Sequence, residues 1–185
     1  MKKYQIIYAD PPWSYGSKQP FRSDGVRFHS LDKEYKTMNI KDICDLNVKS
    51  LTEKDAAIFM WSTDSHIKEA ITCMEAWGFK YVTIAFIWEK VTCKGNLVAN
   101  LGAWTMKNYE ICLFGTKGAM QKHKEVNNIY QKVKAERTKH SKKPEQVRKN
   151  IELLFGDLPR IELFARKKTE GWDVWGNEVE SDIQL

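Results

Sequence analysis

The sequence predicts an α/β fold in which a parallel or mixed sheet is covered by helices on both faces. Two observations support this prediction. Segments typical of strands alternate along the chain with segments of helical periodicity, and several of the strand segments are continuous apolar runs, as expected for buried strands. A length of 185 residues corresponds to about one domain, so we expect one domain over residues 1–185.

The N-terminal third is expected to contain two buried strands, Tyr4 to Ala9 and Ala56 to Trp61. Between them lies a polar loop over residues 14–34, which contains Gly16, Pro20 and Gly25. Loops of this length inside a domain are usually functional or disordered, and its place beside the first strand favours a function. A short helix then follows over Asn39 to Leu46, with Asn39 as its cap.

One helix and two strands are predicted in the middle of the chain. Asp64 or Ser65 is expected to cap a helix that continues through Trp77 and ends at Gly78. The strands are predicted over residues 81–88 and 109–115.

The C-terminal third predicts a helix that opens at Lys143-Pro144, with Val147, Ile151 and Leu154 on its inner face. A strand over residues 160–165 follows it. The segment from Gly171 to Glu178 is expected to form a short strand or turn.

Several classes of protein are disfavoured by the composition. The longest apolar runs are far shorter than the ~18 residues of a membrane span, and we expect an intracellular, cytoplasmic protein. The four cysteines lack zinc-ligand spacing, so free thiols and no metal site are expected. No strand is followed by the glycine pattern of a dinucleotide site or by a phosphate-binding Walker loop.

The positive charge is concentrated in one segment. The chain has a net charge of +6, and residues 117–149, the basic segment, contain eleven Lys or Arg against three Glu and no Asp. A solvated helical face is one interpretation of this run. A surface that faces phosphates is the favoured one, with five residues as candidate nucleic-acid contacts: Lys132, Lys134, Arg137, Lys139 and Lys142.

The sequence Asp10-Pro11-Pro12-Trp13 directly follows the first predicted strand. Open α/β sheets place their chemistry at such strand ends. The prolines have fixed φ angles and no amide donor, so they hold the aspartate beside a flat aromatic ring. Asp10 and a neighbouring carbonyl could accept both hydrogens of an exocyclic amine while Trp13 covers the ring face, although an aspartate before prolines is commonly just a turn.

Segments along nearly the whole chain resemble the MT-A70 family of adenine N6-methyltransferases. Besides Asp10-Pro-Pro-Trp13, the resemblance rests on a series of short motifs in one order: Ile58-Phe-Met-Trp61, Trp77-Gly-Phe79, Trp88-Glu-Lys90, Gly102-Ala-Trp104, Glu110, Lys117-Gly118, His140-Ser-Lys-Lys-Pro144, Ile161-Glu-Leu-Phe-Ala-Arg166 and Gly171-Trp172 to Glu178. It implies a Rossmann-like methyltransferase fold that uses S-adenosylmethionine, in a permuted order with the catalytic strand before the cofactor strand.

The resemblance also implies roles for individual residues. Asp10 would hold the target amine and approach the methionine end of the cofactor, with backbone contacts from Pro11 and Pro12 and with Trp13 against the base. Lys143 would contact the cofactor carboxylate and Glu162 its ribose hydroxyls. The rest of the cofactor pocket would be lined by Phe164, Arg166, Asn177 and Glu178. Where members of the family have a His-Asn pair after the arginine, this chain has Lys167-Lys168-Thr169.

The reaction expected from the resemblance is methyl transfer to the 6-amino group of adenine in nucleic acid. DNA is favoured over RNA, and family analogy suggests the cytoplasm of a prokaryote or of the host cell of its virus. The adenine must be single-stranded or flipped, and Tyr15, Phe21, Phe28 and His29 of the long loop could stack beside it or simply pack the loop. A homodimer or a partner subunit is plausible. The alternatives are a cytosine N4 methyltransferase and a non-catalytic nucleic-acid-binding subunit, and the intact Asp10 disfavours the second.

Overall fold

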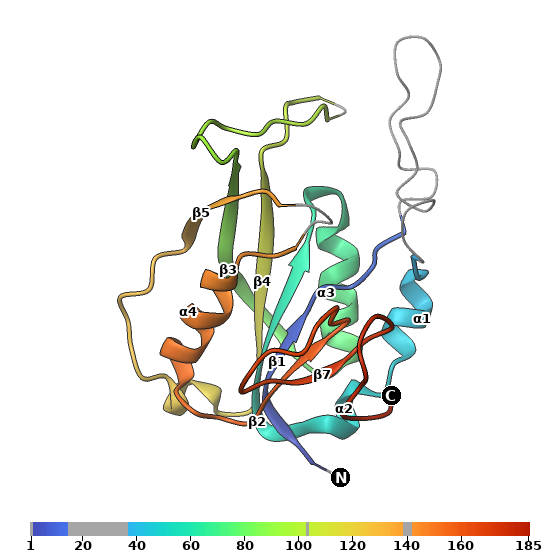
Figure 1. Cartoon of the computed structure of the whole chain (residues 1–185). Coiled ribbons are helices and arrows are strands. Elements are labelled where there is room, and N and C mark those ends of the chain that lie inside the picture. Colours follow the sequence, from blue (N-terminus) through green and yellow to red (C-terminus); the bar gives the residue numbers. More distant parts are fainter. Residues whose placement is uncertain (1, 15–36, 103, 139–141) are drawn as a thin grey trace.

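The computed structural model describes residues 2–14, 37–102, 104–138 and 142–185, and a seven-stranded sheet runs through them (Figure 1). The strands lie in the order β5-β3-β4-β2-β1-β6-β7. Their bounds are β1 (Tyr4–Ala9), β2 (Thr52–Ser62), β3 (Lys80–Val91), β4 (Tyr109–Lys117), β5 (Lys132–Glu136), β6 (Arg160–Leu163) and β7 (Asp173–Trp175). The helices are α1 (Ile40–Asp45), α2 (Val48–Leu51), α3 (Ile67–Ala76) and α4 (Glu145–Phe155), with 3₁₀ turns η3 (Asp64–His66) and η4 (Met120–His123).

The path of the chain creates a switch point between β1 and β6. Strand β1 pairs in parallel with β2 on one side and with β6 on the other, and β6 pairs in parallel with β7. The chain therefore leaves β1 toward β2 and returns through α4 to the opposite side of β1. Ligands of open α/β sheets bind outside the carboxyl ends of the strands at such a point. Asp10 and Phe164 directly follow these two strands.

Helices cover both faces of the sheet, as Figure 1 shows. Side chains of β1 alternate between two apolar clusters: Ile7 and Ala9 lie in the cluster that contains residues of α1, α2 and α3, whereas Ile6 and Tyr8 lie in the cluster that contains residues of α4. The alternation follows from the two-residue period of a strand. The predicted Rossmann-like α/β architecture is confirmed, and the strand that carries Asp10 precedes the adjacent strand that carries Glu162.

Several predicted elements have the observed bounds or differ by a few residues. Strand β1 matches its prediction, and the Asn39 side chain caps α1 by accepting a 2.9 Å hydrogen bond from the Asp42 amide. The cap predicted for α3 was wrong: neither Asp64 nor Ser65 caps it, because a 3₁₀ turn begins at Asp64 and leads into the helix. Gly78, with φ of +87°, follows its end.

The basic segment contains a strand that the sequence analysis did not predict. In β5, Val133 is buried, whereas Lys132 and Lys134 on either side of it are exposed. This alternation is the pattern of a strand with one buried face. The interpretation of the whole segment as a solvated helical face was therefore wrong.

The predicted strand over residues 160–165 ends earlier, at Leu163, because Phe164 has a positive φ of +62°. That left-handed conformation is incompatible with continuing the strand.

Among the described residues, no helix is both long and apolar enough to cross a membrane. In the same part of the chain, no group of three or more His, Cys, Asp or Glu could hold a metal ion.

Candidate active site

The corner after β1 is fixed by backbone hydrogen bonds. The Trp13 amide donates to the Pro11 carbonyl at 2.9 Å, and the Met38 amide donates to the Pro12 carbonyl at the same distance. Because the prolines have no amide hydrogen, their carbonyls are the polar backbone groups that this corner presents. A carbonyl oxygen has two lone pairs, so the Pro11 carbonyl can accept a second hydrogen bond.

Trp13 is more deeply buried than an aromatic ring needs to be in order to stack on a base. Only 7% of its surface is exposed, and its indole nitrogen donates to the Trp61 carbonyl at 3.1 Å. One face of the ring stacks on the buried His66, with centroids 5.9 Å apart and planes 17° apart. The proposal that Trp13 packs against a base therefore concerns the face opposite His66.

Asp10 belongs to a cluster of alternating charges. The Lys143 ammonium lies 2.7 Å from the Asp10 carboxylate and 3.3 Å from the Glu110 carboxylate, and the other Glu110 oxygen accepts from Lys90. Asp10 follows β1, Glu110 lies in β4, Lys90 lies in β3, and Lys143 precedes α4. Residues far apart in the sequence thus meet at one edge of the sheet.

Two tryptophans support this cluster. The Lys143 ammonium lies 5.5 Å from the ring centre of Trp61, and the Lys90 ammonium lies 5.1 Å from that of Trp88. Such cation–π contacts are strongest where water is excluded. The rings of Trp61 and Trp88 meet edge to face, with centroids 6.4 Å apart.

Burial and charge oppose each other in the cluster. Burial disfavours the charged form of Lys143, but Asp10 and Glu110 outweigh it and raise the pKa of this lysine. Burial likewise opposes ionisation of Glu110, yet Lys143 and Lys90 lower its pKa. Lys143 therefore stays a cation and Glu110 stays an anion at neutral pH.

Glu162 lies beside this cluster in β6 and has an unexpected partner. Arg148 of α4 donates from Nε to one Glu162 oxygen at 2.9 Å and from Nη2 to the other at 3.3 Å. The side chains are only 8% and 10% exposed. Burial raises the pKa of Glu162, and Arg148 opposes that shift. Arg148 thus fixes the orientation of the carboxylate through two hydrogen bonds and leaves lone pairs on both oxygens.

The backbone after β6 is strained and closely packed. Phe164 has a positive φ of +62°, a conformation that non-glycine residues adopt at a cost and that is frequent at ligand sites. Its ring meets Trp175 edge to face at 5.3 Å. A Cβ atom at Gly176 would lie 2.1 Å from the Ala165 carbonyl oxygen, so only glycine fits there.

The remaining predicted cofactor residues lie near the ends of β6 and β7. Arg166 and Glu178 are exposed and approach each other, with 3.6 Å between Nε and Oε1. Asn177 is also exposed. Glu162 thus has a buried partner, Arg148, whereas Arg166 has an exposed one, Glu178.

The predicted nucleic-acid contacts do not form one uniform surface. Lys132 lies 2.6 Å from Glu89, and Lys142 lies 2.9 Å from Glu145. Lys134 is exposed, and Arg137 donates to the Asn100 side chain at 3.3 Å. Lys139 lies outside the described residues, as do four residues of the long loop that were proposed to stack beside the base: Tyr15, Phe21, Phe28 and His29.

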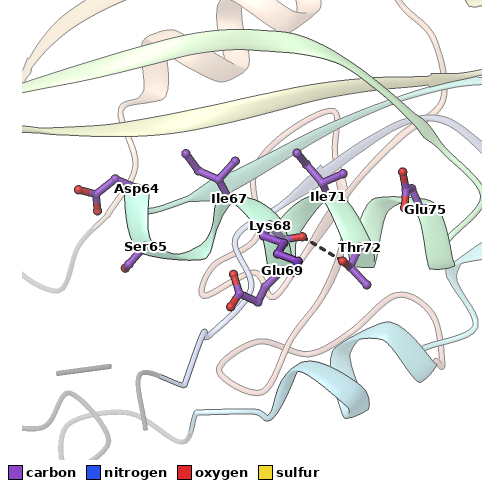
Figure 2. Close-up of a pocket in the computed structure, with 8 residues that line it drawn as sticks. All are labelled: Asp64, Ser65, Ile67, Lys68, Glu69, Ile71, Thr72 and Glu75. Carbon is purple, nitrogen blue, oxygen red and sulfur yellow. Dashed lines mark hydrogen bonds between the residues drawn. The ribbon is translucent and has the colours of Figure 1, made fainter. Parts of the chain in front are cut away.

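A groove along α3 is lined by none of the predicted site residues. Figure 2 shows its eight lining side chains, which all come from the segment between Asp64 and Glu75, with the Thr72 hydroxyl bonded to the Lys68 carbonyl at 3.0 Å. None of the charged residues around Asp10 and Glu162 lines it. The groups able to bind an amine, a carboxylate or a diol lie instead around Asp10 and Glu162.

Comparison with known proteins identifies the family. The family model described as MT-A70 matches residues 4–178. The chain belongs to the MT-A70 family.

Relatives of the chain include "Type II methyltransferase M.MunI" from Mycoplasma, which is 36% identical over 96% of this chain and 78% of that protein. An Arabidopsis "N(6)-adenosine-methyltransferase MT-A70-like" protein is 28% identical over 95% of the chain. The human "N(6)-adenosine-methyltransferase catalytic subunit METTL3" is 26% identical over 96% of it. The chain spans only 24% and 28% of the length of these last two relatives.

Three charged residues of this MT-A70 chain were given no role by sequence reasoning: Lys90, Glu110 and Arg148. The first two lie in motifs that carry the family resemblance, so the sequence contained a signal for them. Arg148 directly follows Val147, which is on the inner face of its helix. An arginine at the border of an apolar helical face can reach the sheet, and this was the available signal for its burial.

Proposed function

We propose that the chain transfers a methyl group from S-adenosylmethionine to the 6-amino group of adenine in nucleic acid. The observation that carries this proposal is the position of Asp10 within 2.7 Å of Lys143 and beside Glu162 on the adjacent strand. Membership in the MT-A70 family and the adenosine methyltransferases among the relatives support it.

The donor groups fit the methyl donor chemically. An amino-acid end carries an ammonium and a carboxylate, and Asp10 and Lys143 offer the complementary charges. They pair with each other here and would each exchange that partner for the ligand. A ribose offers two neighbouring hydroxyls, and the Glu162 carboxylate can accept from both. Phe164, Arg166, Asn177 and Glu178 are proposed to line the adenosine side of the pocket.

When bound, S-adenosylmethionine supplies an electrophilic methyl group on a sulfonium. Asp10 and the Pro11 carbonyl accept the two hydrogens of the adenine amine and hold its nitrogen in line. These hydrogen bonds oppose delocalisation of the nitrogen lone pair into the ring, which makes the nitrogen more nucleophilic. A carbon–nitrogen bond would form as the carbon–sulfur bond breaks, with the sulfur leaving as the thioether of S-adenosylhomocysteine, and the nitrogen would release one proton to the Asp10 carboxylate or to water. Positioning supplies most of the acceleration, and the ordered charges around Asp10 supply the rest.

DNA is the polymer that we favour as substrate. The overlap with the type II methyltransferase from Mycoplasma covers 78% of that protein, whereas the overlap with the adenosine methyltransferases covers about a quarter of theirs. The candidate phosphate contacts are Lys132, Lys134, Arg137, Lys139 and Lys142. We also propose that the protein acts in the cytoplasm, as a homodimer or with a partner subunit.

The test combines labelled methyl donor with matched DNA and RNA strands, followed by mass analysis of the nucleosides. We expect label in 6-methyladenine. Asp10→Ala should abolish transfer while the protein still melts cooperatively, and Asp45→Ala, at an exposed aspartate of α1, serves as the matched control with normal transfer. Label in 4-methylcytosine, or substantial turnover by pure Asp10→Ala protein, would contradict the proposal.

A further inference from the structure

The loop between β3 and β4, residues 92–108, concentrates the exposed apolar side chains of the described chain. We call it the β3–β4 arm. Eight large hydrophobic side chains are exposed among the described residues, and four of them lie on the arm: Leu97, Leu101, Trp104 and Met106. The Trp104 side chain is 97% exposed. A concentration of exposed apolar groups marks a binding surface more often than chance exposure.

The arm lies at the edge of the sheet that carries Asp10. Strand β4 is antiparallel to both β2 and β3, and β2 is parallel to β1. Strand β3 therefore runs in the same direction as β1, so the arm leaves the sheet where β1 ends. Figure 1 shows it projecting beyond that edge.

Contacts hold the arm in place relative to the site. Asn100 and Lys107 exchange two backbone hydrogen bonds of 2.7 and 2.8 Å across it. The Lys107 ammonium lies 2.7 Å from Asp64, two residues before the His66 that stacks on Trp13. The arm is therefore a built part of the active-site edge.

Charge on and around the arm favours a polyanion as its partner. The arm contains Lys94 and Lys107 and no Asp or Glu. Arg137, at the end of β5, donates to Asn100 of the arm at 3.3 Å. From Arg137 the chain leads to Lys142 and then to Lys143 at Asp10. Aromatic side chains among cations are the combination that binds unstacked bases and their phosphates.

We propose that the β3–β4 arm contacts the nucleic acid beside the target adenine and that the Trp104 indole inserts against the neighbouring bases. This inference rests on the proposed function, because an adenine that reaches Asp10 must leave its stack. An apolar wedge offsets the cost of unstacking in proteins that distort a duplex. Trp104 would supply that contact.

The test compares Trp104→Ala with Tyr130→Ala. Tyr130 is 87% exposed and precedes β5. The first residue of β5, Lys132, pairs with Ile87 within β3, so Tyr130 lies farther from the arm than Arg137, which follows the end of β5. Methylation is measured as kcat/KM on a duplex oligonucleotide and on its adenine strand alone. We expect Trp104→Ala to lower the duplex value by about 5- to 150-fold, because the wedge no longer offsets part of the cost of unstacking the duplex. The single-strand value should fall much less, because that strand has no duplex to open. Tyr130→Ala should match the wild type on both.

Other outcomes overturn the inference. Equal kcat/KM for the two variants would show that the arm does not act on nucleic acid. Light scattering could show that the wild type is a dimer and Trp104→Ala a monomer. If Trp104→Ala also lost kcat/KM equally on both substrates, the arm would be a contact between copies of the chain. If the wild type methylates neither substrate, the proposed function fails, and fluorescence anisotropy of the labelled duplex then decides the inference. Unchanged duplex affinity of Trp104→Ala would refute it.

Discussion

Replacing Arg148 by methionine should destabilise the fold and weaken cofactor binding together. Methionine fills a similar volume and leaves the Glu162 carboxylate buried without its two hydrogen bonds of 2.9 and 3.3 Å. Removing one partner of a buried ion pair costs about 3–5 kcal/mol. For a chain of this length, 1 kcal/mol corresponds to about 2–4 °C in Tm, so Arg148→Met should melt about 6–20 °C below the wild type.

The double variant Arg148→Met/Glu162→Gln distinguishes the cost of losing the contact from the cost of leaving a buried charge unpaired. Most of the cost in the single variant comes from the unpaired buried carboxylate, so removing that charge as well should recover much of the lost stability. Lys168→Met is a matched control, because its ion pairs with Glu180 and Asp182 are exposed and should contribute little. Its Tm should remain that of the wild type.

Thermal unfolding and calorimetric titration with S-adenosylhomocysteine measure the two effects. The wild type should prefer this ligand over its 2′-deoxy analogue, because Glu162 is proposed to accept from both hydroxyls. Arg148→Met should lose part of that preference at a temperature where it is fully folded. An Arg148→Met protein that melts within about 2 °C of the wild type, or that keeps the full preference for ribose, would refute the reasoning.

Three further perturbations test other parts of the site. Gly176→Ala should lower Tm and cofactor affinity, because the added Cβ would meet the Ala165 carbonyl oxygen at 2.1 Å, and an unchanged melting curve would contradict this packing. As the pH is lowered, cofactor affinity should begin to fall at a higher pH than an ordinary glutamate implies, because the pKa of Glu162 is raised and only its ionised form accepts from both hydroxyls. Titrations of Glu162→Gln at several pH values should lack this fall in affinity. Replacing Lys134 and Arg137 by Ala should flatten the salt dependence of nucleic-acid binding in anisotropy measurements, and an unchanged slope would remove both from the interface.

Local signals explain why much of the fold could be predicted from the sequence. Pro11 and Pro12 cannot continue a strand that is paired on both sides, because they lack amide hydrogens. Asn39 is a strong cap and does cap α1. The run Tyr4 to Ala9 is apolar at nearly every position, as a strand buried on both faces must be. Each of these features depends on residues close together in the sequence.

The charge partners of the site could not be predicted because they depend on how distant elements meet. Glu162 and Arg148 are fourteen positions apart, on a strand and on the helix that packs over it. In the sequence, Arg148 belongs to a basic run, and such runs are usually solvated. Only the packing of α4 against Tyr8 and its neighbours takes the arginine out of water.

Trp13 illustrates the same difference between local sequence signals and long-range contacts for an aromatic residue. Its position after two prolines predicts a ring at the corner, and the structure has it there. Its stacking on His66 arises from the turn after β2, about fifty residues later. Sequence reasoning could place the ring but could not show which of its faces is already covered.

The two carboxylates proposed to bind ligand receive their cations from one element of the fold. Lys143 at the start of α4 pairs with Asp10 after β1, and Arg148 within α4 pairs with Glu162 in β6. Since β1 and β6 are adjacent and parallel, the helix holds charges on both sides of the switch point. A displacement of α4 would alter the acceptor for the amine and the acceptor for the ribose together. The cations of the basic segment therefore differ in burial: Lys143 and Arg148 pair with the two carboxylates, whereas exposed cations such as Lys134 are the proposed phosphate contacts.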